Sequence, residues 1–187
     1  MIFLWRLKGL FFTIFTFPGV IIHEIAHRFF CDITGTPVYK IKYLDISLDS
    51  DTLGYVEHGE TKSLRSTILI CLGPLIVNTF FCLLFSAPFS LVFSARATNI
   101  LESSHLILLW LAFSIGAHAI PSTQDVSILT NYINKKENLI VQILYFPIRI
   151  LFFITNILSF FWFNAIFSAA IIWLNIEFFG FLFKALR

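Results

Sequence analysis

Long apolar stretches separated by short polar ones make up most of the chain. Residues 66–95 and 103–124 contain no Asp, Glu, Lys or Arg, and residues 139–176 are interrupted by one charge, Arg149. A helix that crosses a membrane needs about 20 mostly apolar residues, so these regions predict one, one and two spans. A further apolar segment runs from about residue 9 to residue 30. The pattern predicts an all-α membrane protein, a polytopic bundle of about five transmembrane helices, with four as the alternative count.

The composition agrees with a membrane protein and excludes other classes. Of the 187 residues 58% are hydrophobic and only 13% are charged, and the mean hydropathy is +0.85. A soluble domain of this composition would expose too much apolar surface to stay monomeric. The net charge of +2 comes from scattered basic residues, which argues against a nucleic-acid partner. We therefore expect the lipid bilayer to surround the protein.

The longest polar stretch, residues 32–65, contains two segments with β-strand character. Residues 38–44 and 53–57 are rich in alternating β-branched and aromatic side chains, and acidic and turn-forming residues lie between them. Alternation with a period of two predicts strands, so we expect a small β-hairpin between the first two helices. The hairpin either only connects these helices or offers a strand edge to which an extended substrate pairs.

The first apolar segment carries an H-E-x-x-H motif at residues 23–27, towards its end. In a helix His23 and His27 lie one turn apart on one face, as two ligands of one metal ion must. Glu24 lies about 100° from His23 round the helix, where its carboxylate can reach a water on the metal. Charged side chains are costly inside a bilayer, by roughly 2.5 kcal/mol or more for Asp, Lys or Arg. A bound divalent cation compensates for this cost, and zinc is the commonest metal for this spacing.

Two histidines do not complete a catalytic zinc site, which has three protein ligands and one open position. The third apolar stretch ends in a run that contains His118, Pro121 and Asp125. Proline ends the helix there, and Asp125 one turn later either caps a new helix or provides the third ligand. His118 is the alternative third ligand, and His58, just past the hairpin, is the least favoured candidate.

Other residues inside the predicted spans disturb a helix or need a polar partner. Pro18 precedes the motif by about one turn and predicts a kink, which is either structural or lets water reach the metal. Asn78 either packs against another helix or presents its amide to a substrate backbone or an oxyanion. Arg149 either extends to the membrane surface or pairs with Glu177 or an acid of the site. Three further asparagines are interpreted as helix-packing contacts, namely Asn156, Asn164 and Asn175.

The depths of these residues and the charges between the spans predict a topology. If the first three spans are antiparallel, the histidine pair, Asn78 and Asp125 fall in or beside one half of the bilayer, since Asn78 lies about 18 Å into its helix. Basic residues gather after the first and third spans, whereas the loop between the second and third carries only Arg96. Five spans with an outside N-terminus place these basic residues in the cytoplasm, although Arg6 and Lys8 oppose this arrangement. We expect the site in the cytoplasmic half of the membrane, which is the plasma membrane if the protein is bacterial.

These landmarks, in this order, resemble the site-2 protease family of intramembrane zinc metalloproteases. That family has H-E-x-x-H in one helix, a Gly-Pro stretch with an asparagine in a later helix, and a third helix that ends in a proline-containing motif with a metal-binding aspartate. Residues 23–27, 73–78 and 121–125 match these three motifs. The resemblance implies a zinc ion bound by His23, His27 and Asp125, with Glu24 as the general base and Asn78 helping to hold the substrate.

The resemblance covers about the first two-thirds of the chain and departs from the family at two positions. Val126 stands where the family usually has glycine, and the asparagine that usually precedes the proline is missing near Pro121. We therefore expect a divergent, minimal member built as one domain, 1–187. Its catalytic core covers about 9–130, and its C-terminal helices cover about 139–187.

The leading hypothesis is a zinc-dependent intramembrane endopeptidase that cleaves a transmembrane or membrane-proximal peptide bond. Its partners are a membrane-protein substrate and either a regulatory membrane protein or further copies of the chain. One alternative is a membrane-embedded hydrolase of a lipid or small amide with the same metal chemistry. Another is a non-enzymatic scaffold or sensor whose metal site is structural.

Overall fold

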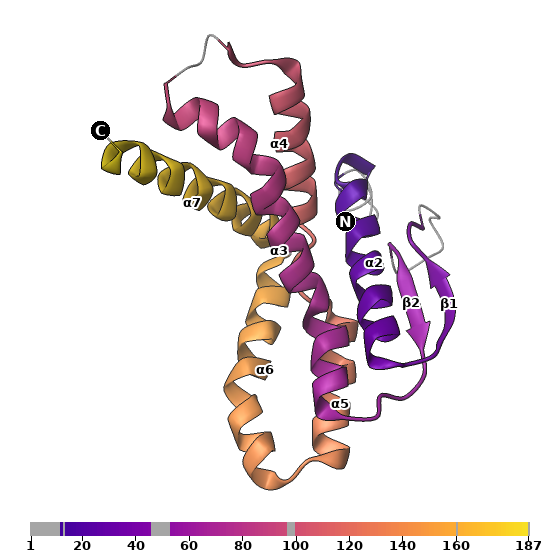
Figure 1. Cartoon of the computed structure of the whole chain (residues 1–187). Coiled ribbons are helices and arrows are strands. Elements are labelled where there is room, and N and C mark those ends of the chain that lie inside the picture. The colour runs from indigo at the N-terminus through magenta and orange to yellow at the C-terminus, as the bar shows by residue number, and fades with distance from the viewer. Residues whose placement is uncertain (1–11, 13, 46–52, 97–99, 160, 187) are drawn as a thin grey trace.

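The computed structural model describes residues 12, 14–45, 53–96, 100–159 and 161–186. Within these residues the chain is mostly helical, with helices α2 to α7 and one two-stranded antiparallel sheet (Figure 1). The start of the first apolar segment, Arg6, Lys8 and the expected hairpin turn at residues 46–52 lie outside the described residues.

Helix α2 (Phe17–Thr34) carries the H-E-x-x-H motif and begins at the proline that was expected to kink it. Pro18 lies in the first turn, where its missing N–H is one of the groups without a helical partner anyway. The helical residues Ile14 and Phe15 precede α2 and are separated from it by a turn at Thr16, so the helical path is interrupted beside Pro18, where the sequence predicted a kink. The helix ends at Thr34 and is capped by Gly35, whose φ of 64° is the left-handed conformation that glycine adopts without steric cost.

The expected hairpin is present between α2 and the next helix, although its turn is not described. Strands β1 (Val38–Lys42) and β2 (Tyr55–His58) pair antiparallel, with Val38 opposite His58 and Lys42 opposite Tyr55. A β-bulge between Val38 and Lys40 shifts the register. The sheet lies against α2, and β2 is the strand beside the helix (Figure 1).

Helix α3 (Leu64–Ser94) is the longest element, and the other helices pack around it. Its 31 residues span about 46 Å at 1.5 Å per residue. Helix α2 lies directly against its first half, because Gly73 leaves room for the ring of Phe30. A Cβ atom at Gly73 would come within 2.1 Å of that ring.

The third apolar stretch forms one helix followed by a break, and a second helix begins at its end, where Pro121 was expected to end a helix and Asp125 to cap the next. Helix α4 (Ser103–Gly116) has 14 residues, and helix α5 (Thr123–Lys136) starts after a break at residues 117–122. Pro121 lies in this break, consistent with its inability to continue a helix. Both helices pack against α3, α4 along its second half and α5 along its first (Figure 1). The break therefore falls midway along α3, beside α2.

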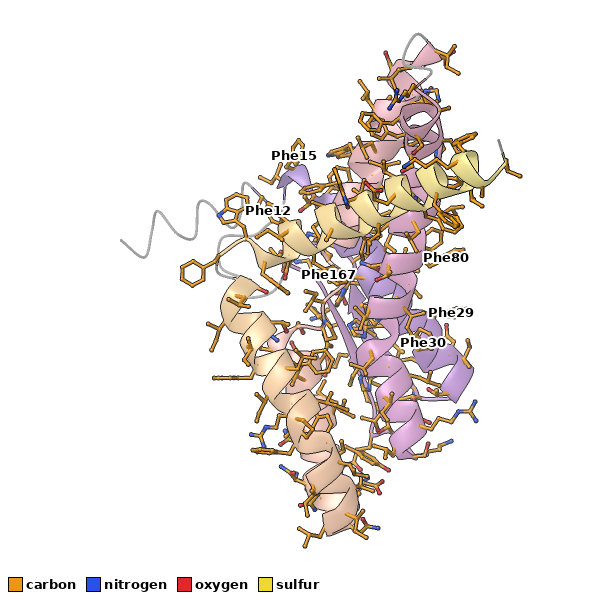
Figure 2. All side chains as sticks on the ribbon, turned by 90° about the vertical axis from the view of Figure 1, so that its left-hand side faces the viewer. Phe12, Phe15, Phe29, Phe30, Phe80 and Phe167 are labelled. Carbon is orange, nitrogen blue, oxygen red and sulfur yellow. The ribbon has the colours of Figure 1, made fainter. Side chains whose placement is uncertain are left out.

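The C-terminal apolar region forms two helices, as predicted. Helix α6 (Leu139–Ser159) packs against α5, and helix α7 (Phe163–Ala185) crosses α3 and α4 (Figures 1 and 2). They follow one another along the molecule and meet near Trp162, which has a left-handed φ of 65°. Arg149 is exposed on α6 and forms no ion pair with Glu177 or any other described residue.

Among the described residues, α3, α6 and α7 are long and apolar enough to cross a membrane, which suggests a membrane protein. Five such helices were expected. Helix α4 is too short on its own, and α2 carries three charged residues in 18 positions. Large apolar side chains project outward, including Phe80, 58% exposed, and Trp173, 61% exposed (Figure 2). Water would be a poor solvent for this surface.

Candidate metal centre

Three side chains from two elements meet beside α3. His23 and His27 lie one turn apart on α2, and Asp125 is in the first turn of α5. The Nε2 atoms of the histidines are 3.1 Å apart, and Asp125 Oδ1 is 3.2 Å from His27 Nε2. Asp125 Oδ2 is 3.7 Å from His23 Nε2. The three side chains are 9–12% exposed, and together they can bind one metal ion.

The backbone determines which imidazole nitrogen carries the proton in each histidine. His23 Nδ1 lies 2.7 Å from the carbonyl oxygen of His118, and His27 Nδ1 lies 2.8 Å from that of Ile70. A carbonyl oxygen only accepts hydrogen bonds, so each Nδ1 is the protonated donor. In a neutral imidazole the other nitrogen, Nε2, then has a free lone pair. Metal-binding histidines are usually oriented in this way, by a hydrogen bond from the nitrogen that does not bind the metal.

Asp125 completes the capping box of α5, whose N-cap is Ser122, and at the same time faces the histidines. Its Oδ2 accepts hydrogen bonds from the Ser122 backbone N–H, at 2.8 Å, and from the Ser122 hydroxyl, at 2.6 Å. Its Oδ1 points to His27. The sequence left capping and metal binding as alternatives for Asp125. The structure shows the cap, and the cap holds the carboxylate in a position where it can also bind a metal.

The donor set fits a small divalent cation. Two imidazole lone pairs and a carboxylate converge, and these groups repel one another unless a positive charge lies between them. Four ligands at about 2.0 Å around a tetrahedral ion are about 3.3 Å apart. The two Nε2 atoms, 3.1 Å apart, and the 3.2 Å from His27 Nε2 to Asp125 Oδ1 are close to this spacing, and one donor atom from each of the three residues lies within 4.8 Å of the others. Nitrogen and oxygen donors of this kind suit zinc and other divalent first-row cations.

Glu24 is buried beside the three donors and has no hydrogen-bonding partner among the described residues. The residue just before β2 keeps it in place: a Cβ atom at Gly54 would lie 2.8 Å from Glu24 Cγ and 3.0 Å from the carbonyl oxygen of Lys42. The hairpin therefore lies directly on the Glu24 side chain. A carboxylate left unpaired next to a metal site is available to take up a proton.

The alternative ligands from the sequence are engaged elsewhere. His118 Nε2 lies 2.8 Å from the Thr16 hydroxyl, and the hydrogen bond between His118 and His23 uses the backbone carbonyl of His118. His58 Nδ1 lies 2.8 Å from the carbonyl oxygen of Gly59. Within the described part of the chain, neither imidazole joins the three-donor group.

Asn78 is placed behind the site. Its amide nitrogen donates to the carbonyl oxygens of Ile115, at 3.1 Å, and His118, at 3.0 Å, with Gly19 at 3.4 Å. The side chain is fully buried and does not line the cavity described below. These contacts match the packing alternative for Asn78. They also connect it to His23, because His118 uses the same carbonyl to orient that imidazole.

A cavity of about 370 Å³ opens in front of the three donors. Its walls are α2, the hairpin from Leu53 to His58, the break before α5, and the junction of α6 with α7. The junction contributes three polar residues that the sequence did not assign to the site, namely Asn156, Ser159 and Asn164. The only indication in the sequence was the presence of amides in a region that is otherwise apolar.

Comparison of the chain with protein-family models, curated proteins and solved structures found no match in any of the three. The interpretation of the site therefore rests on its own geometry.

Proposed function

We propose that the protein is a zinc-dependent intramembrane endopeptidase of the site-2 protease type. The main support is the pair of imidazoles on α2, whose Nδ1 protons are committed to backbone carbonyls and whose Nε2 lone pairs converge with Asp125. Two nitrogens and one carboxylate oxygen, with one position left open, form a ligand set typical of catalytic zinc. A structural zinc site would usually have four protein ligands.

The zinc ion would be held by His23, His27 and Asp125. As a Lewis acid, it would lower the pKa of a bound water to about 7. Glu24 accepts the proton of the attacking water and returns it to the departing amine. Asn78 and the His118 carbonyl orient His23. The hairpin keeps Glu24 against the cavity and excludes bulk water from that side.

The proposed substrate is a membrane-protein segment in an extended conformation. A helix hides its carbonyl groups in its own hydrogen bonds, so a helical substrate has to unwind before a peptide bond is accessible. Strand β2 lines the cavity and pairs with β1 along one edge. An unwound segment can pair with its other edge by strand addition.

The proposed membrane arrangement is multi-pass, with the site in the cytoplasmic half. Helices α4 and α5 pack in succession along α3 and would form one broken traverse. Irregular backbone at membrane depth is tolerated where it lines a polar cavity, as the break at residues 117–122 does. Lys135 and Lys136 at the end of α5 lie on the side that the positive-inside rule assigns to the cytoplasm.

The test is cleavage by the purified protein in lipid nanodiscs, with transmembrane peptides and lipid amides offered separately. We expect peptide cleavage, which Glu24→Gln abolishes while the zinc content stays near one equivalent. Glu177→Gln changes an exposed carboxylate of α7 and is the matched control, with activity unchanged. Undiminished cleavage by Glu24→Gln would contradict its assignment as the base. Hydrolysis of lipid amides alone would favour the lipid hydrolase.

A further inference from the structure

The junction of α6 and α7 contributes two amides and a hydroxyl to the wall of the cavity. An unpaired amide in an apolar environment costs several kcal/mol, so side chains of this kind are usually satisfied by packing. Asn175 in α7 is satisfied in that way: its amide nitrogen donates to the Leu83 carbonyl, at 3.0 Å, and to the Ser86 hydroxyl, at 2.8 Å. The two amides at the junction differ from it.

Only the nitrogen of the Asn156 side-chain amide has hydrogen-bonding partners within the described chain. Its nitrogen donates to the carbonyl oxygen of Phe152, one turn earlier, at 2.8 Å, and lies 3.4 Å from that of Pro121. Its oxygen Oδ1 has no partner among the described residues, and it is not one of the fully buried unpaired atoms. Asn156 lines the cavity, and it also lines a second pocket beside Arg149.

The side-chain amide of Asn164 also has a hydrogen-bonding partner at only one of its two polar atoms. Its Oδ1 lies 2.8 Å from the Ser159 hydroxyl, whose single proton is shared between this oxygen and the carbonyl oxygen of Thr155, at 2.9 Å. The Asn164 nitrogen has no partner among the described residues and is not fully buried either. The junction therefore offers an acceptor on Asn156 and a donor on Asn164.

We propose that Asn156 and Asn164 form a binding site for the backbone of an extended peptide segment. An acceptor and a donor together complement the N–H and C=O that each peptide unit exposes once its helix has unwound. Strand β2 forms another wall of the same cavity, so the segment is bound from two sides through its backbone. This inference rests on the proposed protease function and specifies its substrate class: segments selected by their ability to unwind, with little dependence on side-chain identity.

Binding is measured apart from cleavage, in the Glu24→Gln background and in nanodiscs. The probes are a fluorescent Leu-rich transmembrane peptide with a central Gly-Pro pair and the same peptide without the pair. We expect the interrupted peptide to bind more tightly. The double variant Asn156→Ala, Asn164→Ala should weaken its binding about tenfold, as expected for two lost hydrogen bonds. Zinc content should not change.

Asn175→Ala is the matched control, because it removes a packing amide of α7. It should lower thermal stability and leave the affinity for the interrupted peptide unchanged.

If the double variant does not fold, a cross-link provides the same test. Asn164→Cys should form a disulfide with a cysteine placed beside the Gly-Pro pair, whereas Trp173→Cys, on the exposed face of α7, should not.

Equal binding by the double variant with full zinc content would overturn the backbone site and leave the protease intact. An equal yield of cross-link from positions 164 and 173 would have the same consequence. Failure of the unmodified chain both to bind and to cleave either peptide would remove the proposed function and this inference together.

Discussion

At the scale of single residues, the site depends on which nitrogen of each histidine carries the proton. The two histidines of α2 have their Nδ1 protons fixed by backbone carbonyls of α3 and of the break before α5, so tertiary packing leaves Nε2 free. The motif predicted two ligands on one face, which follows from helical periodicity alone. It did not predict the carbonyls of Ile70 and His118, because these come from elements distant in sequence.

Asp125 provides a prediction at this scale, because capping and metal binding can be separated. Asp125→Ala should lose zinc, whereas Ser122→Ala should keep zinc and destabilise the protein by only about 1 kcal/mol, as lost caps usually do. His118→Ala should also keep zinc, since its imidazole bonds Thr16 and its contact with His23 is made by the backbone carbonyl. Metal analysis and thermal unfolding of the three variants measure both effects. Zinc loss in His118→Ala with retention in Asp125→Ala would reverse the assignment of the third ligand.

At the scale of elements, the hairpin and the broken helix position the chemistry. The break before α5 was partly predictable, because Pro121 and Asp125 mark a helix end and a helix start in the sequence. A hydropathy pattern did not show that α4 ends at Gly116, several residues before Pro121, which is why a full-length span was expected there. The packing of the hairpin on Glu24 was not predictable, since it depends on how the sheet lies against α2.

Gly54 tests this packing. Gly54→Ala places a methyl group 2.8 Å from Glu24 Cγ and about as close to two backbone carbonyls of the hairpin, so the hairpin and Glu24 must separate. We expect kcat to fall about a hundredfold, because a displacement of about 1 Å at a catalytic group has that effect. Zinc content should stay the same. Gly180→Ala in α7 is the control: no atom lies within 4 Å of the added Cβ, and activity should be unchanged. Full activity of Gly54→Ala would show that the hairpin does not position Glu24.

At the scale of the whole molecule, α3 organises the site by holding α2 against its first half and the broken α4–α5 pair along its length. The apolar composition predicted a membrane protein and the C-terminal helices. It did not predict that α6 and α7 meet at the cavity, because hydrophobicity specifies that a helix is apolar and not where it crosses its neighbours. The polar side chains of Asn156 and Asn164 acquire a role only through that meeting point.

The most direct test of the metal centre is X-ray absorption at the zinc edge, together with metal analysis of the purified chain. We expect about one equivalent of zinc with two imidazole nitrogens and one carboxylate oxygen at about 2.0–2.2 Å, removed by a chelator and restored by added zinc. Asp125→Ala should remove the oxygen ligand. A chain that remains metal-free in the presence of excess zinc, or a zinc shell without imidazole, would contradict the metal centre and the hydrolytic chemistry that depends on it.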